Sequence, residues 1–474
     1  MDLIETDICI IGAGSGGMAL AQGAAELGKD VVLVEKAELG GANVKVGSAP
    51  SKALIAAGRA AQAQRSGAAL GIVPIEPHVD GARVMAHVRE TIQALMPLDA
   101  RARFESMGIR IVRAEGRFLD ERTLDAGGHR IRARRFVIAT GSRPQVPQLP
   151  GLESVTAFTT ETIFGIDSIP ANLVVIGGGA VGLELAQAFR RLGAKVTVID
   201  SQRMLPQYER ALSQPVFDAL LREGILLREG AKIHAIERAP GDGVKVQIAR
   251  VQGPETIEGT HLLLATGRMP NIESLALEKA KVATDAKGIK VDAALKTSNS
   301  RIYAIGDAAG APQFAHMAAH HAALILRSFQ FRLTAHSSYD AAPEVLYTDP
   351  EVAHVGLKQA DAEKRKMRFE IVTVPLDETD RGRIDRISES VAKLLVGKGG
   401  RILGASIVAP SAGELILPWV MAISEGIRLS QLASLIVPYP TLGDHITRAA
   451  AAYYAPAEKE SRAHFLSGAL ARFS

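Results

Sequence analysis

One short segment of the sequence occurs twice, and this repeat limits the folds that are open to the chain. In the first copy an apolar run of the kind that forms a buried strand, Asp7–Ile11, precedes the turn Gly12-Ala13-Gly14-Ser15-Gly16-Gly17. An alanine-rich helical stretch then leads to a second apolar run, which ends in Glu35. Strand, G-x-G-x-x-G turn, helix, strand and acid, in this order, are the fingerprint of a dinucleotide-binding unit.

The second copy repeats these parts 165 positions later. An apolar run at Leu173–Ile176 precedes the turn Gly177-Gly178-Gly179-Ala180-Val181-Gly182, and the next strand-like run ends in Asp200. In both copies the acid follows the first glycine by 23 positions. A lone G-x-G-x-x-G turn is weak evidence, whereas two turns in the same context predict two Rossmann-like domains of the α/β class.

The residue types of both turns suit a pyrophosphate. Backbone N–H groups at a helix N-terminus face the anion, and the three spaced glycines of each turn let it approach the backbone. These glycines are Gly12, Gly14 and Gly17 in the first copy and Gly177, Gly179 and Gly182 in the second. Glu35 and Asp200 should accept from ribose hydroxyls. Because a carboxylate at Asp200 repels a 2′-phosphate, we expect a preference for NAD(H) over NADP(H). The nearby Arg203 would weaken this preference.

The rest of the chain divides around this repeat. Two apolar runs, Phe136–Gly141 and Leu262–Gly267, end in Ala-Thr-Gly and close the two domains. A later run ends in Gly306-Asp307, and from about Pro343 strand-like runs lead into helical stretches. We therefore predict one nucleotide-binding domain over residues 1–147 and 270–340, a second over 148–269, and a separate α+β domain over 341–474.

Composition excludes several other classes of protein. A net charge of +4 over 474 residues and an aromatic content of 4% give no reason to expect a nucleic-acid partner. The single cysteine, Cys9, permits neither an internal disulfide nor a thiolate zinc site. No uncharged apolar run reaches membrane-spanning length, and the acidic N-terminus does not fit a signal peptide, so we expect a cytoplasmic protein. His316, His320 and His321 are expected to pack on a helix, with no metal.

Nine segments run through essentially the whole chain in one order: Gly12-x-Gly14-x-x-Gly17, Gly40-Gly41, Pro50-Ser51-Lys52, Ala139-Thr140-Gly141, Gly177–Glu184, Ala265–Asn271, Gly306-Asp307, Tyr347–Glu351 and Pro440-Thr441. In this combination the sequence resembles the FAD-dependent pyridine nucleotide–disulfide oxidoreductases, in particular lipoamide dehydrogenase and the mercuric reductase core. The resemblance implies FAD in the first domain and a nicotinamide nucleotide in the second. It also implies a homodimer built on the C-terminal domain, where we expect the apolar stretch Leu415–Ile423, with Trp419, to form dimer core.

The resemblance also implies roles for individual residues. Lys52 and Glu184 match an ion pair beside the reactive edge of the flavin, where an ammonium stabilises the negative charge that a hydride brings. Asp307 matches the residue that binds the ribityl chain. The remaining implied contacts are Thr140, Gly141, Gly306 and the backbones of Ala114 and Ala315 for FAD, and the backbones of Ile233 and Gly267 for the nicotinamide nucleotide.

The sequence departs from the family in both halves of its dithiol chemistry. Members that act on disulfides carry two cysteines between Gly-Gly and Pro-Ser-Lys, and here those positions hold Asn43 and Ser48, with Lys45 between them. The family's His-Pro-Thr-x-x-Glu acid–base pair is replaced by Tyr439 and Asp444. Because neither Asn43 nor Ser48 can supply a thiolate, we expect no lipoamide, glutathione or mercuric-ion reduction.

Two functions are consistent with this pattern. The first is an FAD-dependent NAD(P)H oxidoreductase that passes electrons from NADH straight to a quinone, a dye, oxygen, a second nicotinamide or a protein partner. Its acceptor-site candidates are Asn43, Lys45, Ser48, Tyr439 and Asp444. The alternative is a non-catalytic FAD-binding assembly or sensor subunit, which the loss of both residue pairs favours. Retention of Lys52, Glu184 and the second glycine turn favours the enzyme.

Overall fold

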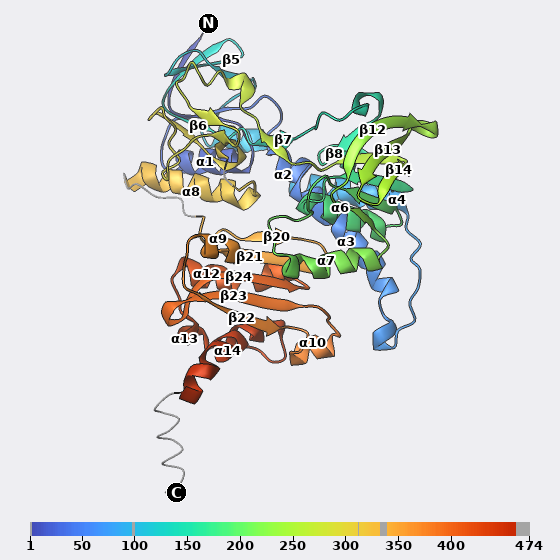
Figure 1. The fold of residues 1–474 in the computed structure, drawn as a ribbon. Coiled ribbons are helices and arrows are strands. Elements are labelled where there is room, and N and C mark those ends of the chain that lie inside the picture. Colours follow the sequence, from blue (N-terminus) through green and yellow to red (C-terminus); the bar gives the residue numbers. More distant parts are fainter. Residues whose placement is uncertain (1, 97–99, 311, 332–338, 461–474) are drawn as a thin grey trace, which may run out of the picture. The chain divides into compact units, whose positions relative to one another are not determined.

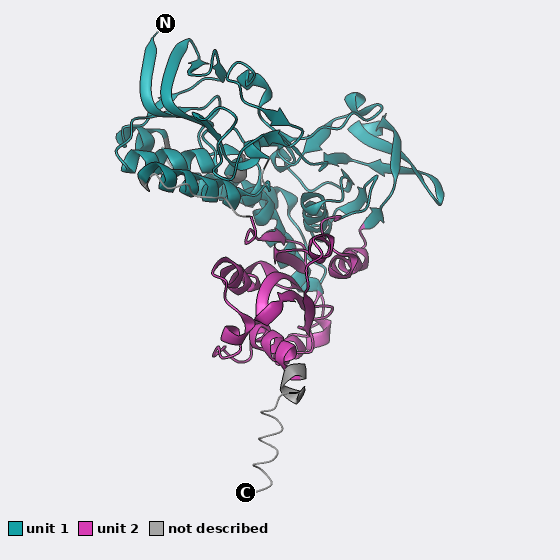
Figure 2. Ribbon diagram, turned by 60° about the vertical axis from the view of Figure 1, so that its left-hand side comes forward, with its two compact units in different colours: residues 1–65, 75–204, 226–337 teal, residues 66–74, 205–225, 338–474 magenta. Residues whose placement is uncertain are grey.

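The computed structural model describes residues 2–96, 100–310, 312–331 and 339–460. The chain divides into two compact units, which Figure 2 shows in different colours. The first unit comprises Met1–Arg65, Ile75–Met204 and Leu226–Ser337. The second comprises Ser66–Pro74, Leu205–Ile225 and Ser338–Ser474. The described helices include none with the length and apolarity that a membrane crossing requires.

The first copy of the repeat builds a seven-stranded sheet in the first unit (Figure 1). Its parallel strands are β1 (Leu3–Ile11), β2 (Val31–Val34), β3 (Arg110–Val112), β6 (His129–Ile138) and β19 (Ile302–Ala304). The antiparallel hairpin β4 (Gly116–Phe118) and β5 (Thr123–Ala126) extends one edge. Helices α1 (Ser15–Glu26) and α8 (Ala315–Phe331) contact each other, and their apolar residues pack on the strands. β1 is apolar and buried over Ile8–Ile11, as a strand covered on both faces must be.

The second copy builds a parallel five-stranded sheet, in the order β11-β10-β9-β15-β8. These strands are β11 (Leu226–Arg228), β10 (Lys195–Ile199), β9 (Asn172–Ile176), β15 (His261–Leu264) and β8 (Ala157–Thr159). Helix α6 (Ala180–Arg191) follows its glycine turn. An antiparallel sheet of β12 (Lys232–Ala239), β13 (Gly243–Arg250) and β14 (Gly253–Gly259) lies between β11 and β15 in the sequence. Two Rossmann-like sheets in one chain confirm the predicted fold class.

Further short elements connect these sheets. Helix α2 (Gly41–Lys45) leads into α3 (Ser48–Arg65), which packs on both α6 and α4 (Gly81–Leu95). Strands β7 (Ser142–Pro144) and β16 (Arg268–Pro270) pair antiparallel, each following the Ala-Thr-Gly segment of its own sheet. The remaining elements of this unit are α5 (Ala100–Ser106), β17 (Thr284–Asp285) and β18 (Gly288–Ile289).

The second unit contains an antiparallel five-stranded sheet, in the order β20-β21-β24-β23-β22. These strands are β20 (Glu344–Leu346), β21 (Glu351–Gly356), β24 (Arg401–Ala409), β23 (Val391–Gly397) and β22 (Glu370–Pro375). The helices of this unit are α7 (Arg210–Arg222), α9 (Gln359–Lys364), α10 (Asp380–Ile384), α11 (Ala412–Leu415), α12 (Leu417–Ser424), α13 (Leu429–Leu432) and α14 (His445–Glu460). Although α7 follows the second Rossmann strand pair in sequence, it contacts β21 and β24.

Trp419 corrects one expectation from the sequence. Its side chain is fully buried in the core of the second unit, so it cannot form a dimer interface. The helix around it is almost entirely apolar, but it buries only one face, because Leu417 and Met421 of the same helix are 51% and 63% exposed. Those two side chains, and not the tryptophan, are the apolar groups that another surface can cover.

Candidate functional site

The first and third glycines of each turn are required by the protein's own backbone. Gly12 has a φ of +105°, and a Cβ on it would overlap the carbonyl oxygen of Ala139. A Cβ on Gly17 would overlap the carbonyl oxygen of Gly12. The second turn repeats both contacts, with Gly177 against Ala265 and Gly182 against Gly177. These glycines therefore close each turn against the end of its sheet.

At the middle position of each turn, the protein's own backbone does not require glycine. Gly14 and Gly179 both have a φ of −77°, which any residue adopts. A Cβ on Gly179 would meet no described atom within 4 Å, and one on Gly14 would meet only the Cα of Gly41, at 3.9 Å. The missing side chain leaves open space at a helix N-terminus, where a pyrophosphate binds through backbone N–H groups. Both turns therefore fit a dinucleotide.

The acids at the strand ends are tied to their turns by matching hydrogen bonds. Glu35 accepts from the N–H of Ala13 at 2.6 Å and from that of Ala37 at 2.8 Å. Asp200 accepts from the N–H groups of Gly178 and Gln202 at 2.7 and 2.8 Å. Each carboxylate is thus held at the carboxyl end of its strand, with lone pairs left for ribose hydroxyls.

Lys52 and Glu184 form an ion pair, and each is the fifth residue of its helix. Lys52 Nζ lies 2.6 Å from Glu184 Oε2, and the glutamate side chain is only 5% exposed. Helices α3 and α6 approach closely where Gly58 faces Ala188, since a Cβ at Gly58 would lie 3.2 Å from the Ala188 carbonyl oxygen. Because a buried carboxylate requires a charged or hydrogen-bonding partner, this packing fixes the position of the ammonium.

The segment that holds cysteines in disulfide-reducing relatives has a different character here. Ser48 is exposed at the first residue of α3, and Lys45 Nζ lies 3.6 Å from Glu38 Oε2. The side chain of Asn43 lies outside the described part of the chain. Cys9 is buried in the middle of β1, and burial raises the pKa of its thiol far above the usual range. The one cysteine of the chain is therefore a packed, protonated core residue.

Asp307, which follows β19, is held from the β7–β16 strand pair. Ser142 Oγ donates to Asp307 Oδ2 at 2.5 Å, and Arg268 Nε donates to Ser142 Oγ at 2.7 Å. The N–H of Gly306 donates to Nδ1 of His321, whose burial lowers its pKa to about 4. Sequence reasoning missed Ser142 and Arg268, because only the folded chain brings them to Asp307.

The three histidines do not act together. His321 is fully buried, whereas His316 and His320 are exposed, and His316 stacks on Phe314 with ring centroids 5.2 Å apart. Across the described ranges, no three His, Cys, Asp or Glu side chains converge as metal ligands would.

The other residues expected to hold FAD belong to the same unit as the first turn. Thr140 Oγ1 is buried and makes no hydrogen bond within the described structure, so a bound cofactor can satisfy it. The N–H of Ala114 already donates to the carbonyl of Val112, which leaves its carbonyl as the group for a ligand. Ala315 is the first residue of the 17-residue helix α8. Two residues are expected to touch the nicotinamide nucleotide. Ile233 lies on β12 and Gly267 follows β15, so both come after the second glycine turn in the sequence.

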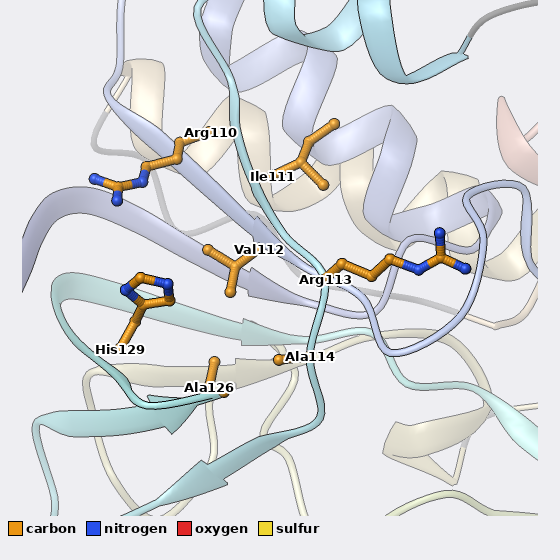
Figure 3. A pocket seen from close by; sticks show the side chains of 8 residues that line it. Arg110, Ile111, Val112, Arg113, Ala114, Ala126 and His129 are labelled. Carbon is orange, nitrogen blue, oxygen red and sulfur yellow. The ribbon is translucent and has the colours of Figure 1, made fainter. Parts of the chain in front are cut away.

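A pocket of about 190 Å³ adjoins Ala114 (Figure 3). One wall is β3 with the two residues that follow it, where the side chains of Arg110 and Arg113 point in opposite directions, and the other is the β5–β6 hairpin, which contributes His129. Nδ1 of His129 is buried and has no partner among the described residues. Of the residues that line this pocket, Ala114 is the one that the resemblance implies for FAD.

The second unit shows what replaces the family's acid–base pair. The hydroxyl of Tyr439 donates to Asp380 Oδ2 at 2.9 Å, and this hydrogen bond raises the pKa of the phenol. Asp444 pairs with Arg448 at 2.9 Å. His445 is buried, where it accepts from Trp419 Nε1 at 2.9 Å and contacts the Leu442 carbonyl at 2.7 Å. Burial lowers the pKa of His445, so this neighbouring imidazole is a neutral structural group.

Comparisons with known proteins agree with this geometry. The family model described as pyridine nucleotide-disulphide oxidoreductase matches residues 6–322, and the dimerisation domain of that family matches residues 342–450. The chain is 33% identical to a mercuric reductase of Bacillus cereus, over 93% of this chain and 70% of that protein. It is 34% identical to a dihydrolipoyl dehydrogenase of Thermus scotoductus, over 94% and 97%. The structure of LpdA from Mycobacterium tuberculosis superposes with a TM-score of 0.84 at 27% identity, covering 94% and 99% of the two chains.

Proposed function

The chain belongs to the pyridine nucleotide-disulphide oxidoreductase family, and we propose that it takes electrons from NADH through FAD and passes them to an acceptor other than a disulfide. Members of this family bind FAD and use NAD(P)H. The observation that carries the proposal is the Lys52–Glu184 ion pair at 2.6 Å in a chain whose one cysteine, Cys9, is buried in a strand. The groups that support hydride transfer are retained, while those of a dithiol relay are missing.

Each residue of the candidate site would have a defined role in binding FAD or in its reduction. FAD, when bound, supplies the ring that accepts a hydride from the nicotinamide and gives up electrons again. Gly12, Gly14 and Gly17 would hold its pyrophosphate, and Glu35 its ribose. Lys52 would hold a positive charge beside the ring, and Glu184 would keep that ammonium in place. A non-catalytic subunit would not need an ammonium held in this position by a buried glutamate, which is why we favour the enzyme.

The acceptor would meet the ring beside the start of α3. There we propose Asn43, Lys45 and Ser48 as contacts, which are polar or basic groups without a nucleophilic thiolate. Tyr439 and Asp444 remain candidates from the C-terminal domain. Tyr439 carries a protonated hydroxyl at neutral pH, since its pKa is raised, and so suits hydrogen bonding to an acceptor oxygen.

A panel of acceptors tests this proposal. Purified holoprotein with NADH should reduce quinones, dyes or oxygen at rates well above its rates with lipoamide, glutathione disulfide and mercuric ion, which should stay at background. Turnover of any of these three as the fastest substrate contradicts the proposal. Loss of all turnover, together with no bleaching of the flavin by NADH, would instead identify a non-catalytic FAD-binding subunit.

We predict that NADH is preferred over NADPH and that Asp200→Gly narrows the difference. The Asp200 carboxylate is fixed at the strand end by two backbone N–H groups, so it cannot swing away from a 2′-phosphate. Specificity constants for both nucleotides, measured with wild type and variant, check this. A wild type that prefers NADPH, or a variant with an unchanged ratio, shows that Asp200 does not set the selectivity.

We also predict a homodimer. The C-terminal residues match the family's dimerisation domain, and Leu417, Met421 and Ile436 expose apolar surface there. Light scattering on the full chain should give twice the mass of 50.2 kDa. Replacing Leu417 and Met421 by Asp, two exposed residues whose change leaves the buried core intact, should shift the protein toward monomer. A monomeric wild type contradicts this expectation.

A further inference from the structure

The β7–β16 strand pair does more than connect the two sheets of the first unit. β7 follows the first sheet and β16 follows the second, and their register sets Ser142 opposite Pro270 and Pro144 opposite Arg268. From that position the Arg268 side chain crosses diagonally to Ser142. Arg268, which follows the second Ala-Thr-Gly segment, is therefore linked directly to Ser142, which follows the first.

The contacts of Arg268 form a continuous path to Asp307. The guanidinium donates to Glu161 Oε1 at 2.9 Å and to the Ser142 carbonyl at 2.8 Å, while its Nε donates to Ser142 Oγ at 2.7 Å. Ser142 is only 7% exposed, and its hydroxyl donates a hydrogen bond to Asp307 Oδ2 at 2.5 Å. A hydroxyl that accepts from a cation becomes a stronger donor, so the charge of Arg268 strengthens the bond to Asp307.

We infer that Ser142 and Arg268 are positioning residues for FAD, which act by fixing the rotamer of Asp307. With Oδ2 bonded to Ser142, the other oxygen, Oδ1, receives no hydrogen bond from the described residues and is presented to a cofactor hydroxyl. The inference rests on the proposed role of Asp307 in holding FAD. It does not depend on which acceptor the enzyme reduces.

The same strand pair offers a matched control. Arg143, next to Ser142, makes an ion pair with Glu273 at 2.7 Å and lowers the pKa of that carboxyl to about 2. Like Arg268 it cross-links the two strands, since it also donates to the Pro270 carbonyl at 3.2 Å. Its hydrogen-bond partners in the described structure are Pro270, Asn271 and Glu273, so its loss weakens the strand pair and leaves the path to Asp307 untouched.

The dissociation constant of FAD, measured from flavin fluorescence on serial dilution of purified holoprotein, tests the inference. Ser142→Ala and Arg268→Gln should each raise it about tenfold, the size expected for losing one charge-assisted hydrogen bond. Arg143→Gln should change it by less than about twofold, because a partly exposed pair contributes little. In an Asp307→Ala background, Ser142→Ala should add nothing further, since coupled residues are not additive.

Two results would overturn the path from Arg268 through Ser142 to Asp307 without contradicting the proposed function. Equal losses for Arg143→Gln and Arg268→Gln would show that the strand pair matters only for stability. An undiminished effect of Ser142→Ala in the Asp307→Ala background would show that Ser142 does not act through Asp307. If Asp307→Ala itself leaves the dissociation constant of FAD unchanged, the proposed role of Asp307 is wrong, and so is the inferred role of Ser142 and Arg268. The result of the acceptor panel would not change.

Discussion

Lys52→Met should slow the reduction of bound FAD by NADH about 10- to 1000-fold while leaving FAD bound. An ammonium about 4 Å from a developing negative charge contributes on the order of 4 kcal/mol at an effective dielectric constant of 20. Lys52 is 36% exposed and paired with Glu184, so solvent screening and pairing cancel part of this. At about 1.4 kcal/mol per decade, the remainder gives the stated range. Methionine keeps the approximate length of the side chain, removes the charge and leaves Glu184 without its ammonium partner.

The measurement is anaerobic stopped-flow bleaching of the flavin after mixing with NADH. A matched control is Lys281→Met, because Lys281 pairs with Glu121 at 2.6 Å on the surface of the same unit, 74% exposed. The control should be reduced at the wild-type rate. A Lys52→Met protein that holds FAD and is reduced as fast as wild type shows that this ion pair does not support hydride transfer.

Gly14→Val and Gly179→Val should each remove one nucleotide and spare the other. Neither glycine is needed for the backbone, since both have a φ of −77°, and an added Cβ would meet nothing within 4 Å at Gly179 and only the Gly41 Cα, at 3.9 Å, at Gly14. Both variants should therefore fold. A valine there occupies the space of the pyrophosphate and removes several charge-assisted hydrogen bonds, each contributing about 1.5–3 kcal/mol. We expect Gly14→Val to weaken FAD binding at least about 100-fold. Gly179→Val should retain yellow FAD but lose saturation by NADH.

Each variant is the control for the other. Flavin absorbance after gel filtration reports FAD, and the NADH concentration dependence of bleaching reports the second site. Loss of FAD from Gly179→Val, or retention of full FAD affinity in Gly14→Val, would reverse or refute the assignment of the two turns. Circular dichroism should be unchanged in both proteins.

Local patterns account for the parts of the fold that were predictable. The apolar runs that were expected to end in Glu35 and Asp200 form the strands Val31–Val34 and Lys195–Ile199, because a short apolar run bounded by a helix and an acid is a clear strand signal. The pairing of Lys52 with Glu184 came from resemblance and not from spacing, since the two residues are 132 positions apart. The structure adds the reason for it, which is the close packing of α3 on α6 at Gly58.

What could not be predicted depends on contacts between distant segments. Ser142 and Arg268 are ordinary residues in sequence, and only the β7–β16 register brings both to Asp307. The antiparallel sheet β12–β14 was not expected, because its strands expose one face and lack a long apolar run. Trp419 was misplaced since an apolar helix in a sequence does not reveal whether its own chain or a second copy covers it.

Counting the electrons that the holoprotein accepts tests the central claim most directly. Anaerobic titration with dithionite, followed by flavin absorbance, measures the reducing equivalents taken up per FAD. A flavin that works without a dithiol relay is fully reduced by two electrons, and the buried thiol of Cys9 adds none. A relay through a redox-active disulfide requires a second pair, since disulfide reduction is itself a two-electron step. We predict two electrons per FAD, and an uptake of four would contradict the account.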